Sequence, residues 1–373
     1  MLSVFLSRIL EALLLRAYSL KKKMLQMPKP LGISVYVSTF ELQIPMLEKL
    51  KGKNSSIFTS FHISEEVNDS YVTKAKDMCK WLHQHGFQII ADVSPKTLEI
   101  FAQHGLIRFA EDMHVSVLRL DYGFDEQEIT RTAKQIPIAF NASTLNLDAP
   151  FVLEGHKLYA MHNFYPRPET GLDWKLFETI NQTIKQNGSA QLVAFIPGDE
   201  ILRGPIYEGL PTIETHRELP PYVAYLDLIK NHSVYQVFIG DVTISSEQLK
   251  LIEDYRSSKI ISLPVRFESD FDYLYDHVYS IRIDSPSGLM RLQESRGYAS
   301  QGKTINVQHC TERTRGKVTI DNEAYKRYSG EIQIMRQHYP KDGRVNVIGE
   351  IIEGYVPLVD CVKNGEKIRF VKI

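Results

Sequence analysis

Between residues 31 and 263 the chain alternates between two spacings of apolar positions. Short apolar runs predict buried parallel strands, and each run is followed by a stretch in which apolar residues recur at helical spacing. The clearest helical stretch is 173–186, where Phe177, Ile180 and Ile184 fall on one face. The predicted strands are 32–37, 56–60, 88–92, 117–121, 138–141, 157–161, 191–196 and 235–239.

This alternation predicts an α/β fold, a parallel (β/α)8 TIM barrel. A doubly wound open sheet alternates in the same way, but no G-x-G-x-x-G follows the first predicted strand, so a dinucleotide-binding fold loses support. Polar side chains recur just after the strands end, and in a barrel these ends meet at the face that carries the active site. The candidate site residues at this face are His62, Asp92, Lys96, Arg119, Asp121, Tyr122, Asn141, His162, Asn163, Tyr165, Arg167, Glu169, Asp199, Arg203 and Asp241.

After residue 264 the pattern changes to short strands separated by polar turns. We therefore expect a barrel domain over 28–263 and a smaller β-rich domain over 264–373. The predicted strands of the second domain are 317–320, 329–335, 344–352 and 367–373.

Residues 1–27 are interpreted as an extension outside the fold. Their apolar run is interrupted by Arg8, Glu11 and Arg16, and the lysines follow the run, which is the reverse of a secretory signal. A spanning helix needs about 20 nearly uncharged residues. A helix lying on a membrane surface is the alternative.

Charge and cysteine content restrict the function further. The formal net charge is -1, so no basic surface suggests nucleic acid as a partner. The three cysteines are widely separated, which favours a reducing compartment over a disulfide framework. None has the spacing of a zinc site, so we assign no metal and expect no cofactor.

The most distinctive segment is 159–171, in which a short strand runs into polar residues stiffened by Pro166 and Pro168. In this segment and in several others, the chain resembles the bacterial 6-phospho-N-acetylmuramidases. The matching stretches, in chain order, are Phe-Thr-Ser-Phe-His-Ile (58–63), Ala-Asp-Val-Ser-Pro (91–95), Leu-Arg-Leu-Asp-Tyr-Gly (118–123), Asn-Ala-Ser-Thr (141–144), His-Asn-Phe-Tyr-Pro-Arg-Pro-Glu-Thr-Gly (162–171), Arg-Gly-Pro-Ile-Tyr-Glu-Gly-Leu-Pro-Thr (203–212) and Asp-Asn-Glu-Ala-Tyr-Lys-Arg-Tyr-Ser-Gly-Glu (321–331).

The resemblance implies a TIM barrel followed by a cyclophilin-like β domain. It also implies a cytoplasmic glycosidase that splits MurNAc 6-phosphate–GlcNAc into MurNAc 6-phosphate and GlcNAc during peptidoglycan recycling. The expected partner is this phosphorylated amino-sugar disaccharide, with no nucleic acid and no stable membrane association.

Cleaving a glycosidic bond requires one group that protonates the leaving oxygen and one that supports the positive charge at the anomeric carbon. We assign the nucleophilic or stabilising role to Asp121 and the acid/base role to Glu169. In a second mechanism the substrate's own acetamido group attacks, and Asp121 or Asp199 orients it. Arg203 is the first choice for the phosphate, because it follows the seventh strand and its planar guanidinium matches phosphate geometry. Arg167 and Lys96 are the other cationic candidates, and the remaining residues are expected to bind the sugar.

Two other functions stay open. A metal-dependent sugar isomerase or aldolase would use His62 and His162 as ligands. A sugar-phosphate-binding sensor would keep the pocket without turnover.

Overall fold

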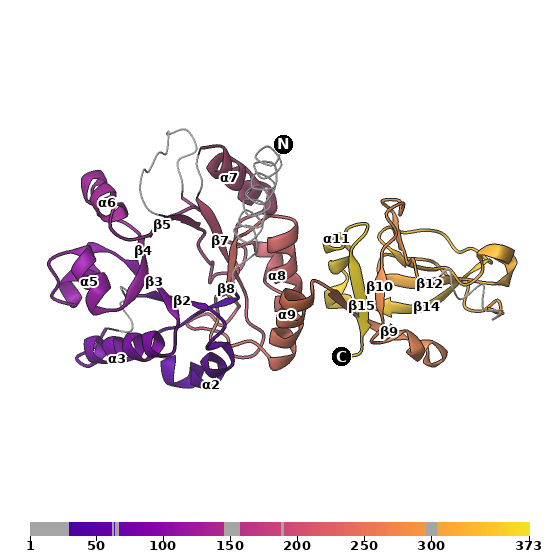
Figure 1. The fold of residues 1–373 in the computed structure, drawn as a ribbon, viewed down its shortest axis with the longest axis horizontal. Helices are drawn as coiled ribbons and strands as arrows, with labels where there is room; N and C mark the ends of the chain where they lie inside the picture. The colour runs from indigo at the N-terminus through magenta and orange to yellow at the C-terminus, as the bar shows by residue number, and fades with distance from the viewer. Residues whose placement is uncertain (1–29, 62, 64–66, 145–156, 188–189, 296–303) are drawn as a thin grey trace, which may run out of the picture. The chain divides into compact units, whose positions relative to one another are not determined.

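Eight parallel strands close into a barrel in a computed structural model, which describes residues 30–61, 63, 67–144, 157–187, 190–295 and 304–373 (Figure 1). The TIM barrel predicted from the sequence is therefore confirmed. The barrel strands are β1 (Gly32–Ser34), β2 (Ser56–Ser60), β3 (Gln88–Val93), β4 (Val115–Leu120), β5 (Ile138–Asn141), β6 (Leu158–Met161), β7 (Gln191–Ile196) and β8 (Gln236–Ile239). The α-helices that alternate with them are α2 (Phe40–Leu50), α3 (Tyr71–Gln84), α4 (Pro95–Ile100), α5 (Leu106–Asp112), α6 (Glu126–Ala133), α7 (Trp174–Asn187), α8 (Pro221–Lys230) and α9 (Ser246–Ser258).

The first strand is shorter than the prediction of 32–37. It ends at Ser34, and a turn begins where the Thr39 N–H donates to the carbonyl of Tyr36 at 3.1 Å. Strands β2, β5 and β7 have the predicted limits. Apolar runs thus located the strands well, but they did not show where the first strand turns into a loop.

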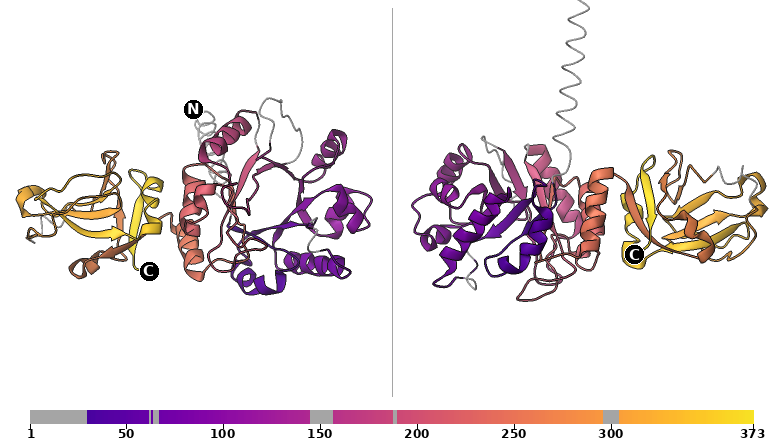
Figure 2. Two further views of the ribbon diagram at one scale, coloured as in Figure 1. Left: turned by 180° about the vertical axis from the view of Figure 1, so that it is seen from behind. Right: turned by 60° about the horizontal axis from the view of Figure 1, so that its bottom comes forward.

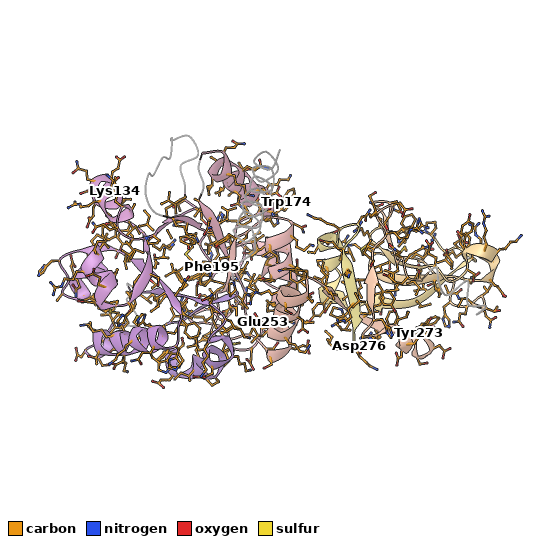
Figure 3. All side chains as sticks on the ribbon, viewed as in Figure 1. Lys134, Trp174, Phe195, Glu253, Tyr273 and Asp276 are labelled. Carbon is orange, nitrogen blue, oxygen red and sulfur yellow. The ribbon has the colours of Figure 1, made fainter. Side chains whose placement is uncertain are left out.

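Side chains alternate across a strand, so residues two positions apart, such as Val193 and Phe195 of β7, both point into the barrel interior. Phe195 of β7 lies in this core (Figure 3). Its ring packs against the rings of Phe58 and Phe238. A Cβ atom on Gly32 would come within 2.4 Å of the Phe238 ring, so a larger residue would displace that ring.

The same alternation carries polar side chains to the mouth of the barrel. Ile90 and Val117 belong to the apolar core, and the residues two positions further along their strands are Asp92 and Arg119. Both are buried, at 7% and 5% exposure. Polar groups of the predicted site therefore point inward at the carboxyl ends of the strands.

The described chain divides into two compact units. The first holds the barrel strands and comprises the described residues up to Ile196 with Arg203–Glu214 and Ser233–Thr243. The second comprises 197–202, 215–232 and 244–373, so it contains α8 and α9 together with the C-terminal sheet. The domain limits predicted from the sequence, 28–263 and 264–373, stay a prediction, because this division follows contacts and not the order of the chain.

Seven strands form the sheet of the second unit, in the order β10-β15-β9-β14-β12-β13-β11. Figure 2 shows this unit in orange and yellow from two further sides. All neighbours are antiparallel except β9 and β15, which pair in parallel. This confirms a smaller β-rich part after the barrel. The strands are β9 (Ile261–Phe267), β10 (Val278–Ser280), β11 (Leu289–Arg291), β12 (Lys317–Asp321), β13 (Ile332–Met335), β14 (Val345–Ile351) and β15 (Lys367–Val371). The short helices are α11 (Leu358–Cys361) and the 3-10 turns Glu214–His216, Ser269–Leu274, Glu323–Tyr328 and Glu353–Tyr355.

The four strands predicted for this unit are confirmed as β12 to β15, and three strands were missed. β10 and β11 have only three residues each, too few for a visible alternation. β9 contains Pro264, which lacks an N–H and usually marks an edge or a break, although β9 lies between β14 and β15.

Residues 1–27 lie outside the described residues, so the expectation of an N-terminal extension stays a prediction. Within the described part of the chain, no helix has both the length and the apolar character needed to span a membrane.

Candidate active site

Arg119 joins three strands at the mouth of the barrel. Its guanidinium Nη1 lies 2.5 Å from Asp92 Oδ1 on β3 and 3.7 Å from Asp121 Oδ1 just after β4. Its Nη2 donates to Asn163 Oδ1, after β6, at 2.6 Å. A buried guanidinium is tolerated only when paired and hydrogen-bonded, which these partners provide. The structure thus brings four predicted site residues into direct contact.

His162 is a buried structural link beside this group. It is fully buried, its Nε2 lies 2.8 Å from Asn181 Oδ1 on α7, and its Nδ1 lies 3.3 Å from Ser143 Oγ. Burial lowers the pKa of the His162 imidazole to about 4, against a smaller opposing effect of the Asn181 hydrogen bond, so the ring is neutral near pH 7.

Asn181 and Ser143 were not among the predicted site residues. Asn181 is a polar residue on the buried face of α7, beside Ile180 and one turn from Phe177 and Ile184. A polar residue within an apolar stripe is the sequence signal that identifies it. Ser143 lies in the Asn-Ala-Ser-Thr stretch that carries the resemblance.

The loops after β6 and β7 are joined along their length. The Tyr165 N–H donates to the Pro211 carbonyl at 3.0 Å, and Thr212 Oγ1 donates to the Asn163 carbonyl at 2.8 Å. Further on, Leu172 pairs with Ile213 in an isolated parallel bridge. The segment stiffened by prolines is therefore one half of a framework built from two loops.

Glu214 fixes the turn that carries Glu169. Its two carboxylate oxygens accept the N–H groups of Glu169 at 2.8 Å and Gly171 at 2.7 Å. Glu169 has a φ of +68°, and a Cβ atom on Gly171 would lie 2.5 Å from Glu214 Oε2. Glu169 is exposed, and its own carboxylate makes no ion pair with any described residue. Glu214 was not among the predicted site residues, because it lies two residues beyond the 203–212 stretch that carries the family resemblance.

Asp241 and Tyr36 hold Arg203. Asp241 is fully buried, and its two oxygens accept the N–H groups of Arg203 at 2.9 Å and Leu210 at 3.0 Å, which closes the loop 203–210. The Arg203 guanidinium lies 3.5 Å from the centroid of the buried Tyr36 ring. Among the described residues, no carboxylate forms an ion pair with the Arg203 guanidinium.

The other predicted residues of the first unit differ in their exposure. Asn141 is half-buried, and its Oδ1 accepts the Ser143 N–H at 3.1 Å. Tyr165 is half-buried; Lys96, Tyr122 and Arg167 are exposed. His62 lies outside the described residues.

Asp199 belongs to the second compact unit. Its carboxylate oxygens accept the Ser245 N–H at 2.7 Å and the Ser245 hydroxyl at 2.8 Å, at the start of α9. This carboxylate therefore holds the N-terminus of a helix.

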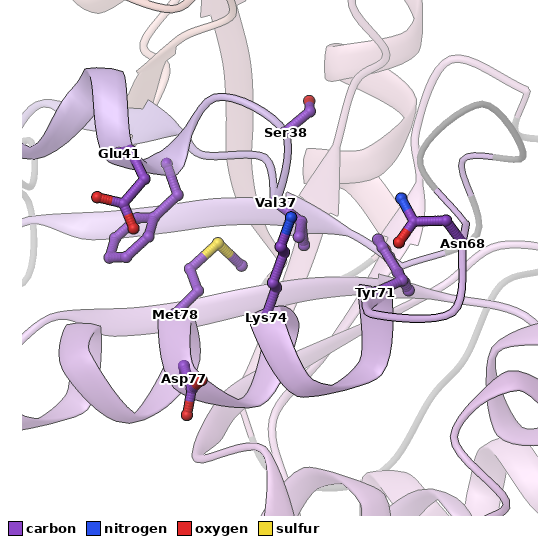
Figure 4. Close-up of a pocket in the computed structure, with 9 residues that line it drawn as sticks. Val37, Ser38, Glu41, Asn68, Tyr71, Lys74, Asp77 and Met78 are labelled. Atoms are coloured by element: carbon purple, nitrogen blue, oxygen red, sulfur yellow. The ribbon is translucent and has the colours of Figure 1, made fainter.

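A pocket of ≈ 320 Å³ opens beside α2 and α3 (Figure 4). Glu41 lines it from α2, and Lys74 and Met78 line it from α3. The residues that line this pocket include none of the predicted site residues.

Comparison with known proteins matches both parts of the chain to domains of one family. Residues 31–254 match the 6-phospho-N-acetylmuramidase N-terminal domain, and residues 261–371 match the C-terminal domain of the same family. The chain is similar to a conserved protein of unknown function from Enterococcus faecalis, with 32% identity and a TM-score of 0.79 over 91% of this chain and 96% of that one. It is also similar to an uncharacterized B. cereus protein, with 26% identity and a TM-score of 0.76 over 93% of this chain and 100% of that one. No curated protein matches the sequence.

Proposed function

The chain belongs to the 6-phospho-N-acetylmuramidase family, and from this membership we propose that it hydrolyses 6-phosphorylated MurNAc-GlcNAc to MurNAc 6-phosphate and GlcNAc. The family name denotes a glycosidase that acts on 6-phospho-muramic sugars. The particular disaccharide, a cytoplasmic location and a role in peptidoglycan recycling are parts of the proposal. So is a cyclophilin-like identity for the C-terminal sheet. The reaction is proposed to need no cofactor.

The observation that carries the proposal is the guanidinium of Arg203. It is half-buried, stacked on Tyr36, and without a carboxylate partner among the described residues. A partly desolvated cation held in this way favours an anionic ligand, and a guanidinium matches the oxygens of a phosphate. The loop after the seventh strand of a barrel is also a frequent place for phosphate. We therefore assign the 6-phosphate to Arg203.

Asp121 is proposed as the nucleophile or the group that stabilises the transition state. It lies at the mouth of the barrel, 3.7 Å from the buried Arg119 guanidinium, which limits its freedom to move. Glu169 is proposed as the acid/base, because its backbone is anchored by Glu214 while its carboxylate remains exposed at the rim.

The second mechanism, in which the acetamido group attacks the anomeric carbon, needs a carboxylate that orients this group. Asp199 was one candidate, but Ser245 donates to both of its oxygens. This favours Asp121 for the orienting role as well. Following the released anomer by NMR distinguishes retention from inversion, and a retained product is expected of both a covalent and a substrate-assisted route.

The remaining candidates are proposed to contact the sugar or to hold those that do. Asp92, Arg119, His162 and Asp241 make buried hydrogen bonds within the protein, which favours a positioning role. Residues proposed to meet the ligand are His62, Lys96, Tyr122, Asn141, Asn163, Tyr165 and Arg167.

A metal-dependent isomerase or aldolase receives less support. Both ring nitrogens of His162 are engaged with protein groups, and the ring is fully buried. Exhaustive chelation is expected to leave hydrolysis unchanged. Product analysis separates the enzyme from a sensor, which would bind the disaccharide without cleaving it.

The direct test compares MurNAc 6-phosphate–GlcNAc with the unphosphorylated disaccharide. We expect hydrolysis of the first and a strong preference for it in kcat/KM. Arg203→Ala is expected to lower that preference about 10- to 100-fold, the equivalent of a lost charge-assisted hydrogen bond. Arg131→Ala, an exposed arginine on α6, is the matched control and should leave the preference unchanged. An Arg203→Ala enzyme with the full preference would refute the phosphate assignment.

A further inference from the structure

Asn163 is held from three directions at the carboxyl end of β6. Its N–H donates to Ser143 Oγ at 2.9 Å, and its carbonyl accepts from Thr212 Oγ1 at 2.8 Å. Its side-chain Oδ1 accepts from Arg119 Nη2 at 2.6 Å. Backbone and side chain are therefore fixed by groups from different strands.

The buried His162 sets the direction of the first of these bonds. Asn181 Oδ1 accepts from His162 Nε2, so the proton of the neutral ring is on Nε2 and its Nδ1 is an acceptor. Ser143 then donates its hydroxyl proton to Nδ1 and keeps its lone pairs for the Asn163 N–H. Ser143, His162 and Asn181 form a hydrogen-bonded chain that ends on the backbone N–H of Asn163.

Arg119 sets the orientation of the Asn163 amide. A guanidinium has only donors, so the atom that faces it must be the amide oxygen. The amide nitrogen Nδ2 then points away from Arg119. Among the described residues, Nδ2 has no hydrogen-bond partner, although every other polar group of Asn163 is engaged. Two N–H donors are therefore fixed in place and available to a ligand.

The position of this donor indicates which ligand group it meets. Asp121, the carboxylate proposed to act at the anomeric carbon C1, is held by the same guanidinium as Asn163. The carbon next to C1 is C2, which carries the acetamido group in an N-acetyl sugar. Arg203, assigned to the 6-phosphate, is held by a different pair, Tyr36 and Asp241. A sugar with C1 beside Asp121 would therefore bring its C2 acetamido carbonyl, an acceptor, to the same part of the mouth as the Asn163 amide.

We propose that Asn163 Nδ2 donates a hydrogen bond to the acetamido carbonyl at C2 and so makes the site specific for N-acetylated sugars. This inference rests on the proposed function, because the catalytic role proposed for Asp121 places C1 of the sugar beside this carboxylate. A free amine at C2 is a protonated donor near neutral pH. It would face the Asn163 donors without an acceptor, so the site rejects the de-N-acetylated sugar.

The test measures dissociation constants, by calorimetry, of MurNAc 6-phosphate and of muramic acid 6-phosphate, which lacks only the acetyl group. The wild-type protein is expected to bind the N-acetylated compound about 10- to 100-fold more tightly. Asn163→Asp replaces the donors with a carboxylate, which accepts from the protonated amine and has no donor for the acetamido carbonyl, so we expect the ratio to fall to about one or below. The ratio of the two constants does not depend on the fraction of correctly folded protein.

Asn54→Asp is the matched control. It makes the same chemical change in an exposed turn before β2, away from the mouth of the barrel. It should keep the wild-type ratio. Ser143→Ala removes the support of the Asn163 backbone and should reduce the ratio in part, with little change in the affinity for the amine.

A wild-type ratio near one, or an unchanged ratio in Asn163→Asp, would overturn the inference. Hydrolysis of MurNAc 6-phosphate–GlcNAc by the wild-type protein is measured alongside. If the wild-type protein does not hydrolyse this disaccharide, the proposed function is wrong, and this result is distinct from a failure of the Asn163 inference alone.

Discussion

Replacing Arg119 with methionine tests the arrangement of the barrel mouth most directly. Methionine fills much of the same volume but removes the guanidinium that joins Asp92, Asp121 and Asn163. Asp92, only 7% exposed, would then keep a buried negative charge without its main cationic partner.

The magnitude follows from this geometry. Removing one partner of a buried ion pair costs about 3–5 kcal/mol, mainly because the other charge stays buried. If that is the cause, the double variant Asp92→Asn with Arg119→Met should recover about half of the loss, since the buried charge that faced Arg119 is gone. Asp92→Asn alone should cost about 1–3 kcal/mol, because Arg119 keeps its bond to Asn163.

Urea unfolding followed by tryptophan fluorescence reports on the unit that contains these residues. The chain has two tryptophans, Trp81 on α3 and Trp174 on α7, and both belong to the first compact unit. The double-mutant cycle then isolates the interaction between Asp92 and Arg119.

Two results would contradict these expected losses of stability. A loss below about 1 kcal/mol in Arg119→Met would mean that the mouth does not depend on the buried pair. A double variant no more stable than Arg119→Met would mean that the buried charge of Asp92 is not the cause of the loss.

Three further predictions concern separate groups. The pKa of His162 falls from an unfolded value of 6.5 to about 4, so between these values the folded state binds fewer protons than the unfolded state. Stability is therefore complete above pH 6.5 and is lost as the pH falls towards 4, by about 3 kcal/mol, and His162→Gln should remove most of this dependence in urea midpoints at pH 7 and 4.5. Asp241→Asn should loosen the loop 203–210 and weaken binding of MurNAc 6-phosphate about tenfold, with less effect on MurNAc; equal losses for both ligands in calorimetry would argue against it. Cys310 is half-buried, whereas burial raises the pKa of each of the other two thiols to about 12, so the native protein should react with one equivalent of a thiol reagent first and with three after unfolding.

The sequence was sufficient for the barrel because its signal is local. Each strand needs an apolar run and each helix an apolar stripe, and both are visible within a few residues, as in 191–196 and 173–186. It was also sufficient to place Asp92, Arg119 and Asn163 after or near the ends of strands, where a barrel concentrates its chemistry.

Contacts between these residues depended on the tertiary structure. Asp92 and Arg119 meet because β3 and β4 are adjacent in a register that sets Asp92 opposite Arg119. Glu214 reaches the turn of Glu169 from a position 45 residues away in the chain. Local periodicity determines which face of an element is buried, but the closure and register of the barrel determine which side chains meet there. For that reason the pattern of the sequence predicted the fold and the residues near the mouth, whereas the hydrogen bonds and ion pairs among these residues follow from how the barrel closes.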